Sequence, residues 1–147
     1  MTAIDTDKPG GGILFACNMN SIRSPMAEII ARQLLGGRVP VRSVGVYEGG
    51  MDPFIGMILA EDGFELGDHD PQTFADIDPR DFRVAVALTR EAAGEALKYF
   101  PPTAVETWEI PNPTDTRGSR EQMLNAYREA RDILKRRIAE RFGAMAR

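Results

Sequence analysis

A cysteine and an arginine separated by five residues stand near the start of the chain. Cys17 opens the segment Cys-Asn-Met-Asn-Ser-Ile-Arg-Ser, which ends with Arg23 and Ser24. A loop of this length can wrap a tetrahedral oxyanion while a guanidinium binds two of its oxygens. An apolar run precedes the segment and Ser-Pro follows it, which indicates a helix N-terminus, where anions bind and the thiolate form of cysteine is favoured. The spacing predicts a loop that binds a tetrahedral oxyanion, with Cys17 as a thiolate nucleophile beside it.

An alternative interpretation of Cys17 is a small residue that fills space at a strand end, since free cysteines are often buried. The chain holds one cysteine and one histidine. One cysteine cannot form an internal disulfide, and the pair cannot complete a structural zinc site. We therefore expect no metal and no cofactor.

Apolar runs alternate with segments of helical spacing and predict the framework that positions the loop. Residues 13–17 and 82–88 are typical of strands buried on both faces of a parallel sheet, and residues 41–46 and 105–110 supply two more strands. With a helix pattern after each strand, they predict an α/β fold: a four-stranded parallel sheet with helices on both faces, doubly wound. Ligands bind such sheets at the carboxyl ends of the strands, where Cys17 stands.

Capping residues mark the expected helix starts. Ser24 and Thr89 are predicted caps of the first and third helices, and Asp52 with the proline after it opens the second. Ser119 and Gln122 form the capping-box pattern of a long closing helix.

Length and composition indicate one globular domain. The chain has 147 residues, of which 43% are hydrophobic, enough for a single core. We expect a flexible N-terminal tail over residues 1–12 and one domain over residues 13–147. No apolar run approaches the ~18 residues of a membrane span, and no secretory signal is visible, so we expect a cytoplasmic protein without a membrane partner.

The formal net charge of -4 conceals a basic C-terminal end. Residues 117–147 carry nine basic and four acidic side chains. Because arginine and glutamate alternate there without interleaved aromatic residues, the pattern favours a solvated helix face over a phosphate-backbone contact surface. We expect no nucleic acid partner.

From residue 13 to residue 142 the chain resembles the low-molecular-weight protein tyrosine phosphatase family. The resemblance rests on the strand-loop-helix of residues 17–28, the Ser-Val-Gly-Val of residues 43–46, His69, and the Trp-Glu-Ile-Pro-Asn-Pro of residues 108–113. It implies a phosphatase-I-like version of the predicted fold, in which a cysteine attacks phosphorus and the resulting thiophosphate is hydrolysed.

The resemblance also implies roles for individual residues. Cys17 would be the nucleophile, Arg23 the phosphate clamp, and Ser24 the hydrogen-bond partner that helps the sulfur to leave. The phosphate-binding loop would comprise Asn18, Met19, Asn20, Ser21, Ile22 and Arg23. The residues that hold this loop in shape would be Asn20, Ser43 and His69.

Three residues depart from the family pattern. Met19 stands where members usually have Gly, so we expect different backbone angles in the loop. Ile22 replaces the second cysteine of many members, so no neighbouring thiol can protect Cys17 as a disulfide. Asn112 stands before proline where the family carries the aspartate that protonates the leaving oxygen. An amide cannot transfer that proton.

Asp115 lies three residues beyond Asn112 and offers a substitute catalytic acid. The alternative for Asp115 is a turn or cap aspartate ahead of the last helix. Tyr47 and Trp108 are candidates for a pocket wall, although both residue types also occur in cores and strands. Tyr47 is favoured because its loop follows a strand end.

These observations predict a cysteine-dependent phosphomonoesterase that acts on phosphotyrosine or other aryl phosphates through a thiophosphate, and that is slow if Asn112 replaces the acid. Its partners would be a phosphorylated protein or a small aryl phosphate, with inorganic phosphate as a ligand. The alternative is a catalytically weak or silent relative that binds phosphate or a phosphoprotein. Arsenate reduction through a relay of further cysteines is disfavoured, because the chain has only one cysteine.

Overall fold

A parallel sheet forms the centre of the computed structural model, which describes residues 10–146. Its strands are β1 (Gly12–Cys17), β2 (Val41–Gly45), β3 (Phe82–Ala87) and β4 (Val105–Thr107). They pair in the order β2-β1-β3-β4, all in parallel. The chain winds outward from β1 in one direction and later in the other, so a topological switch point lies beside the carboxyl end of β1. The predicted doubly wound α/β fold is confirmed.

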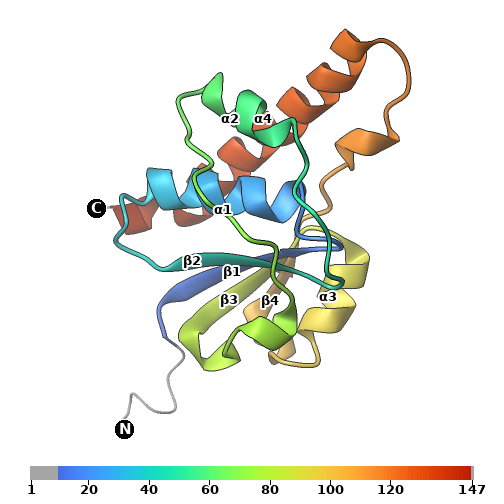
Figure 1. Cartoon of the computed structure of the whole chain (residues 1–147). Coiled ribbons are helices and arrows are strands. Elements are labelled where there is room, and N and C mark those ends of the chain that lie inside the picture. The colour runs from blue at the N-terminus through green and yellow to red at the C-terminus, as the bar shows by residue number, and fades with distance from the viewer. Residues whose placement is uncertain (1–9, 147) are drawn as a thin grey trace, which may run out of the picture.

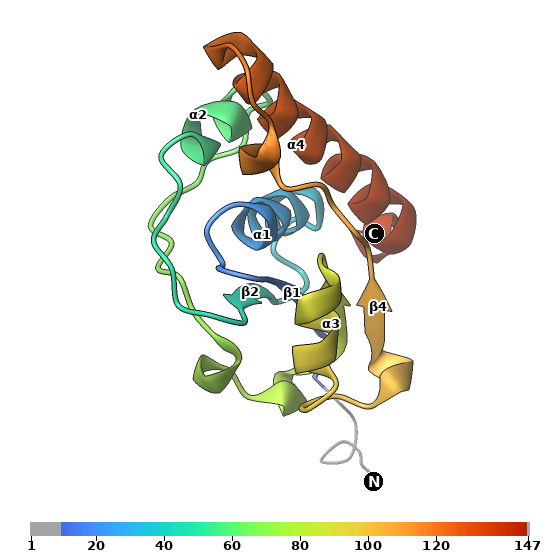
Figure 2. The same cartoon turned by 90° about the vertical axis from the view of Figure 1, so that its right-hand side faces the viewer.

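Four α-helices cover the sheet (Figures 1 and 2). They are α1 (Arg23–Leu34), α2 (Ile55–Ala60), α3 (Arg90–Ala96) and α4 (Arg120–Phe142). Side chains alternate across β1, so that Ile13 and Phe15 pack in the core under α1, α2 and α4, whereas Leu14 and Ala16 pack in the core under α3. Each face of the sheet therefore has a helical layer of its own.

Two of the predicted starts use the expected residues. Thr89 accepts a hydrogen bond from the Ala92 N–H at the start of α3, and Ser119 forms the predicted capping box at the start of α4. The second helix begins later than predicted, at Ile55 and without a side-chain cap, although Asp52 accepts a hydrogen bond from the Phe54 N–H just ahead of it. The first helix differs from the prediction: α1 begins at Arg23, so Ser24 lies inside the helix and does not cap it.

The last strand is shorter than predicted. Regular pairing ends at Thr107, yet the Trp108 N–H donates to the Ala87 carbonyl at 2.8 Å and the Ile110 N–H donates to the Leu88 carbonyl at 3.1 Å. The segment therefore continues beside β3 as extended chain. It carries the residues after Ile110 to the mouth of the Cys17 loop.

The N-terminal prediction is covered only in part by the structure. Residues 1–9 of the predicted tail lie outside the described residues, and Gly12 is the first residue of β1. Within residues 10–146, none of the helices is both long enough and apolar enough to cross a membrane.

Candidate active site

The loop after β1 encloses a small cavity at the carboxyl end of the sheet. The cavity has a volume of about 250 Å³, and the Cys17 side chain at its base is only 2% exposed. The lining residues are Cys17, Met19, Ser21, Ile22, Arg23, Gly50, Asp52, Asn112 and Thr114. This cavity brings most of the predicted phosphate-binding loop together with Arg23 and Asn112.

Loop carbonyls form hydrogen bonds with the surrounding chain. The Cys17 and Asn18 carbonyls accept from the N–H groups of Val46 and Tyr47, at 3.0 and 2.8 Å. The Asn18 side chain accepts a hydrogen bond of 2.7 Å from the hydroxyl of Thr89, which also caps α3. These bonds tie the loop to the ends of β2 and β3.

The Ser24 hydroxyl contacts the Cys17 thiol and does not cap α1. Its hydroxyl oxygen lies 2.9 Å from the Cys17 sulfur and 3.2 Å from the Val44 carbonyl oxygen, and it is fully buried. A hydroxyl has one proton to donate. When Cys17 is a thiolate, the sulfur can only accept, so the Ser24 proton turns toward it and stabilises the negative charge.

Asn20 holds the loop through both ends of its amide. The Nδ2 group donates to the hydroxyls of Ser24 at 2.8 Å and Ser43 at 3.0 Å. The Oδ1 atom accepts from the Gln72 N–H at 2.8 Å and lies 3.1 Å from His69 Nε2, which must donate because this oxygen can only accept. Asn20 thus contacts both Ser43 and His69. That these three residues hold the loop in its active shape stays a prediction.

Strain in the loop falls on Asn20. Its φ of 53° is the only positive value at a non-glycine residue within residues 10–146. Asparagine tolerates this left-handed conformation better than most residues. Met19 therefore adopts no glycine-like φ.

A buried carboxylate anchors the far end of this network. Glu28, on α1, is 5% exposed and accepts a hydrogen bond of 2.5 Å from the Ser43 hydroxyl. The Arg32 guanidinium pairs with it, and His69 Nδ1 lies 3.7 Å from its Oε1 atom. Because a buried carboxylate is stable only when paired, Arg32 allows Glu28 to fix the Ser43 hydroxyl. Our sequence reasoning assigned no role to Glu28 or Arg32.

Gly45 is a second residue whose role the sequence analysis missed. A Cβ atom at this position would lie 2.7 Å from the Asn20 nitrogen and 2.9 Å from the Asn18 carbonyl oxygen, distances that real Cβ contacts do not reach. Only glycine lets β2 approach the loop this closely. The Ser-Val-Gly-Val segment of residues 43–46 was noted in the sequence, but no local pattern shows that its glycine lies against residues 18–20.

Arg23 stands at the first position of α1 and lines the cavity. One of its guanidinium nitrogens donates to the Ile110 carbonyl at 3.0 Å. This bond ties the arginine to the segment after β4. The guanidinium is thereby held at the cavity wall, where its other N–H groups can serve an anion.

The segment after Ile110 places Asn112 at the cavity and the candidate acid Asp115 outside its lining. Asn112 lines the cavity, and its side-chain oxygen accepts bonds from the N–H and hydroxyl of Thr114, at 3.1 and 2.9 Å. It caps a short 3-10 turn, Pro113–Asp115. Asp115 is exposed at the end of that turn and does not line the cavity.

The two aromatic candidates for a pocket wall lie outside the cavity lining. Trp108 is buried against Phe15 and Phe142 in the core. Tyr47 is 52% exposed and its hydroxyl donates to Glu91 at 2.5 Å. Sequence reasoning did not foresee that the cavity would include Asp52, which lies just before α2.

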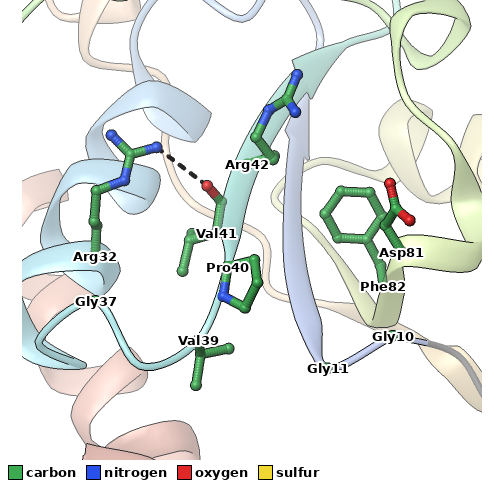
Figure 3. Close-up of a pocket in the computed structure, with 10 residues that line it drawn as sticks. All are labelled: Gly10, Gly11, Arg32, Gly37, Val39, Pro40, Val41, Arg42, Asp81 and Phe82. Atoms are coloured by element: carbon green, nitrogen blue, oxygen red, sulfur yellow. Dashed lines mark hydrogen bonds between the residues drawn. The ribbon is translucent and has the colours of Figure 1, made fainter.

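A larger cavity lies at the opposite end of the sheet (Figure 3). It has a volume of about 660 Å³ and is bordered by the amino ends of β2 and β3, with Arg32 reaching the Val41 carbonyl across it. Its lining contains no cysteine, serine or histidine, whereas Cys17 lines the smaller cavity. Within residues 10–146, no cluster of three histidine, cysteine or acidic side chains could hold a metal ion.

Comparison with known proteins places this geometry in a family. Residues 12–147 match the family model described as low molecular weight phosphotyrosine protein phosphatase. An arsenate reductase of Bacillus licheniformis is 30% identical over 129 residues, which cover 86% of this chain and 91% of the relative. An arsenate reductase of Bacillus subtilis is 27% identical over 128 residues, covering 87% and 92%.

A solved structure has the same fold. The tyrosine phosphatase AmsI of Erwinia amylovora superimposes with a TM-score of 0.77 at 19% identity, covering 99% of this chain and all of that one. At this identity the likeness concerns the fold alone, and the family model carries the assignment. The chain belongs to the low molecular weight phosphotyrosine protein phosphatase family.

Proposed function

We propose that the chain is a cysteine-dependent phosphomonoesterase that hydrolyses phosphotyrosine or other aryl phosphates through a thiophosphate on Cys17. The observation that carries this proposal is the contact of 2.9 Å between the Cys17 sulfur and the Ser24 hydroxyl, at the base of a cavity that Arg23 also lines. This geometry supports the proposal, because the Cys17 thiol and the Arg23 side chain border one small space and the Ser24 hydroxyl is within hydrogen-bond distance of the sulfur.

In the first step the Cys17 sulfur attacks phosphorus, and the bond between phosphorus and the aryl oxygen breaks. Arg23 and the backbone N–H groups of the loop stabilise the charge on the three phosphoryl oxygens. In the second step water displaces the sulfur, and the Ser24 hydroxyl stabilises the departing thiolate. Aryl esters are favoured because a phenol, with a pKa near ~10, leaves more readily than an aliphatic alcohol.

The cavity is also compatible with a second function, in which the chain is a catalytically silent relative that only binds phosphate or a phosphorylated protein. Asn112 favours this second proposal, because an amide stands where the family carries its acid. Loss of a general acid typically costs 10²–10⁴ in rate, so a chain without one would turn over slowly while its loop still bound anions.

Arsenate reduction is a further candidate because two curated relatives bear that name. Arsenate is a tetrahedral oxyanion like phosphate, and Cys17 could attack its arsenic. Reduction to arsenite takes two electrons, which two thiols supply as they form a disulfide. With one cysteine in the chain, the second thiol must come from a small-molecule thiol or another protein.

Phenyl phosphate hydrolysis by wild type, Cys17→Ser and Arg23→Lys separates these candidates. The proposed phosphatase hydrolyses phenyl phosphate, and both variants lose that activity, since a lysine point charge cannot replace the planar fork of arginine. Full activity in Cys17→Ser would refute the mechanism.

Alkylation of the thiol tests binding independently of turnover. Inorganic phosphate should protect Cys17 from iodoacetamide in the wild type. Protection without turnover would favour the silent relative that only binds phosphate. If the wild type showed neither protection nor turnover, both the phosphatase and the silent relative would be excluded. Arsenite formation that depends on an added thiol, without phosphate ester hydrolysis, would favour the reductase.

A further inference from the structure

A single carboxyl group lines the cavity that contains Cys17. Among the nine lining residues, Asp52 alone is acidic. The other candidates fail on chemistry or position, because Asn112 has an amide and Asp115 lies exposed outside the lining. Proton transfer to a leaving oxygen requires a titratable group within hydrogen-bond reach of it.

Three hydrogen bonds hold Asp52 in place. Its backbone N–H donates to the Ser21 carbonyl at 3.3 Å, which fastens it to the phosphate loop itself. Its Oδ1 atom accepts from the Phe54 N–H at 2.7 Å, and its Oδ2 atom accepts from the Tyr127 hydroxyl at 2.8 Å. Tyr127 belongs to α4 and is 2% exposed, so the core of the protein positions this carboxyl.

Helix capping alone does not require the Tyr127 contact. Asp78 forms the same Asp-Pro turn, with its Oδ1 atom accepting from the Arg80 N–H at 3.0 Å, but its partner is an exposed arginine on the same turn. Asp52 instead joins the loop, the start of α2 and α4 at the cavity wall. A tyrosine hydroxyl can donate to a carboxylate and accept from a carboxylic acid, so this partner suits both protonation states.

We propose that Asp52 is the proton-transfer residue of this enzyme and takes the role that Asn112 cannot perform. The inference rests on the proposed phosphatase function. As the Cys17 sulfur bonds to phosphorus, the electron pair of the breaking phosphorus–oxygen bond stays on the aryl oxygen. That oxygen receives the proton of the Asp52 carboxylic acid, which releases a neutral phenol and leaves a carboxylate.

The same carboxylate then completes the cycle. A water oxygen attacks the phosphorus of the thiophosphate and gives one proton to Asp52. The phosphorus–sulfur bond breaks, its electron pair returns to Cys17 as thiolate, and inorganic phosphate leaves. The protein ends with the thiolate and carboxylic acid with which it began.

Substituted phenyl phosphates test this assignment, with leaving groups from nitrophenol to unsubstituted phenol. Asp52→Asn retains an oxygen that can accept from the Phe54 N–H but cannot transfer a proton. It should lower kcat by about 10²-fold on phenyl phosphate and by much less on nitrophenyl phosphate, since good leaving groups need little protonation. Asp52→Glu, which keeps a carboxyl, should retain the leaving-group dependence of the wild type.

The matched control is Asp78→Asn, which makes the same change in an Asp-Pro turn that lies outside the cavity lining. It should have wild-type rates on every substrate. Folding of each variant is checked by phosphate protection of Cys17 from alkylation, which needs no turnover.

Three outcomes would overturn the assignment. Unchanged leaving-group dependence in a folded Asp52→Asn variant would show that this carboxyl carries no proton. A steeper dependence in Asp115→Asn instead would move the role to Asp115. If phosphate no longer protected Cys17 from alkylation in either Asp52 variant, Asp52 would be needed for the shape of the loop and not for proton transfer. A wild type that hydrolyses none of the esters overturns the phosphatase function itself, and is thereby distinguished from these results.

Discussion

Asn20→Ala should unfold the phosphate loop and cost much of the protein's stability. The side chain makes four hydrogen bonds, to Ser24, Ser43, His69 and the Gln72 N–H. At about 1 kcal/mol for each bond, their loss amounts to about 4 kcal/mol. Alanine at a φ of 53° adds roughly 1–2 kcal/mol, because its Cβ disfavours the left-handed region more than asparagine does. Native domains are stable by about 5–15 kcal/mol, so the variant should be marginal.

Urea unfolding measures this loss. With an m-value of about 2 kcal/mol/M, the combined loss of about 5–6 kcal/mol moves the midpoint down by about 2.5–3 M. Asn20→Gly is the matched control, because glycine adopts the φ of 53° without penalty and loses only the hydrogen bonds. A loss below about 1 kcal/mol in Asn20→Ala, with protection of the thiol by phosphate intact, would refute the idea that this amide holds the loop.

Three further perturbations test other parts of the structure. Gly45→Ala should abolish phosphate protection of the thiol, because its Cβ would lie 2.7 Å from the loop backbone; protection at wild-type phosphate concentrations would contradict this. Hydrogen bonds from Arg128, the main cause, lower the pKa of Glu61 from 4.5 to about 2, so this carboxylate stabilises the fold above pH 4.5 and the contribution is lost as the pH falls toward 2. Glu61→Gln should flatten the pH dependence of the urea midpoint in that window, and an unchanged slope would exclude the pair as its source. Peroxide should inactivate the enzyme irreversibly unless a small thiol is present to cap Cys17, because the chain offers no second cysteine; full recovery without a cap would count against this.

The sheet could be predicted from sequence because its central strands are mostly apolar. Residues 13–17 are all buried, and residues 82–88 are buried except for Arg83, which is exposed, so residue type directly reflects burial on both faces of the sheet. The spacing of Cys17 and Arg23 after the first run placed the loop at a strand end. Both inferences depend on residues close together in the chain, where spacing controls geometry.

The remaining features depend on contacts between distant segments. Gly45 is required because β2 passes the loop at van der Waals distance, and no local pattern reports a neighbour 25 residues away. Asp52 was predicted to open a helix that in the structure begins only at Ile55, and its place at the cavity depends on distant contacts, since Tyr127 on α4 donates to its carboxylate. Ser24 matched the pattern of a cap, yet α1 begins two residues earlier than a Ser24 cap implies, and the Ser24 hydroxyl contacts the Cys17 sulfur instead.

The central claim is that a phosphoryl group passes through the sulfur of Cys17. Intact-mass analysis of protein quenched in denaturant during phenyl phosphate turnover tests it most directly. We expect a fraction of wild-type protein to be heavier by one phosphoryl group, located by peptide mapping on Cys17, and we expect neither adduct nor turnover in Cys17→Ala. Turnover that persists in Cys17→Ala, or a wild-type adduct on any other residue, would contradict it.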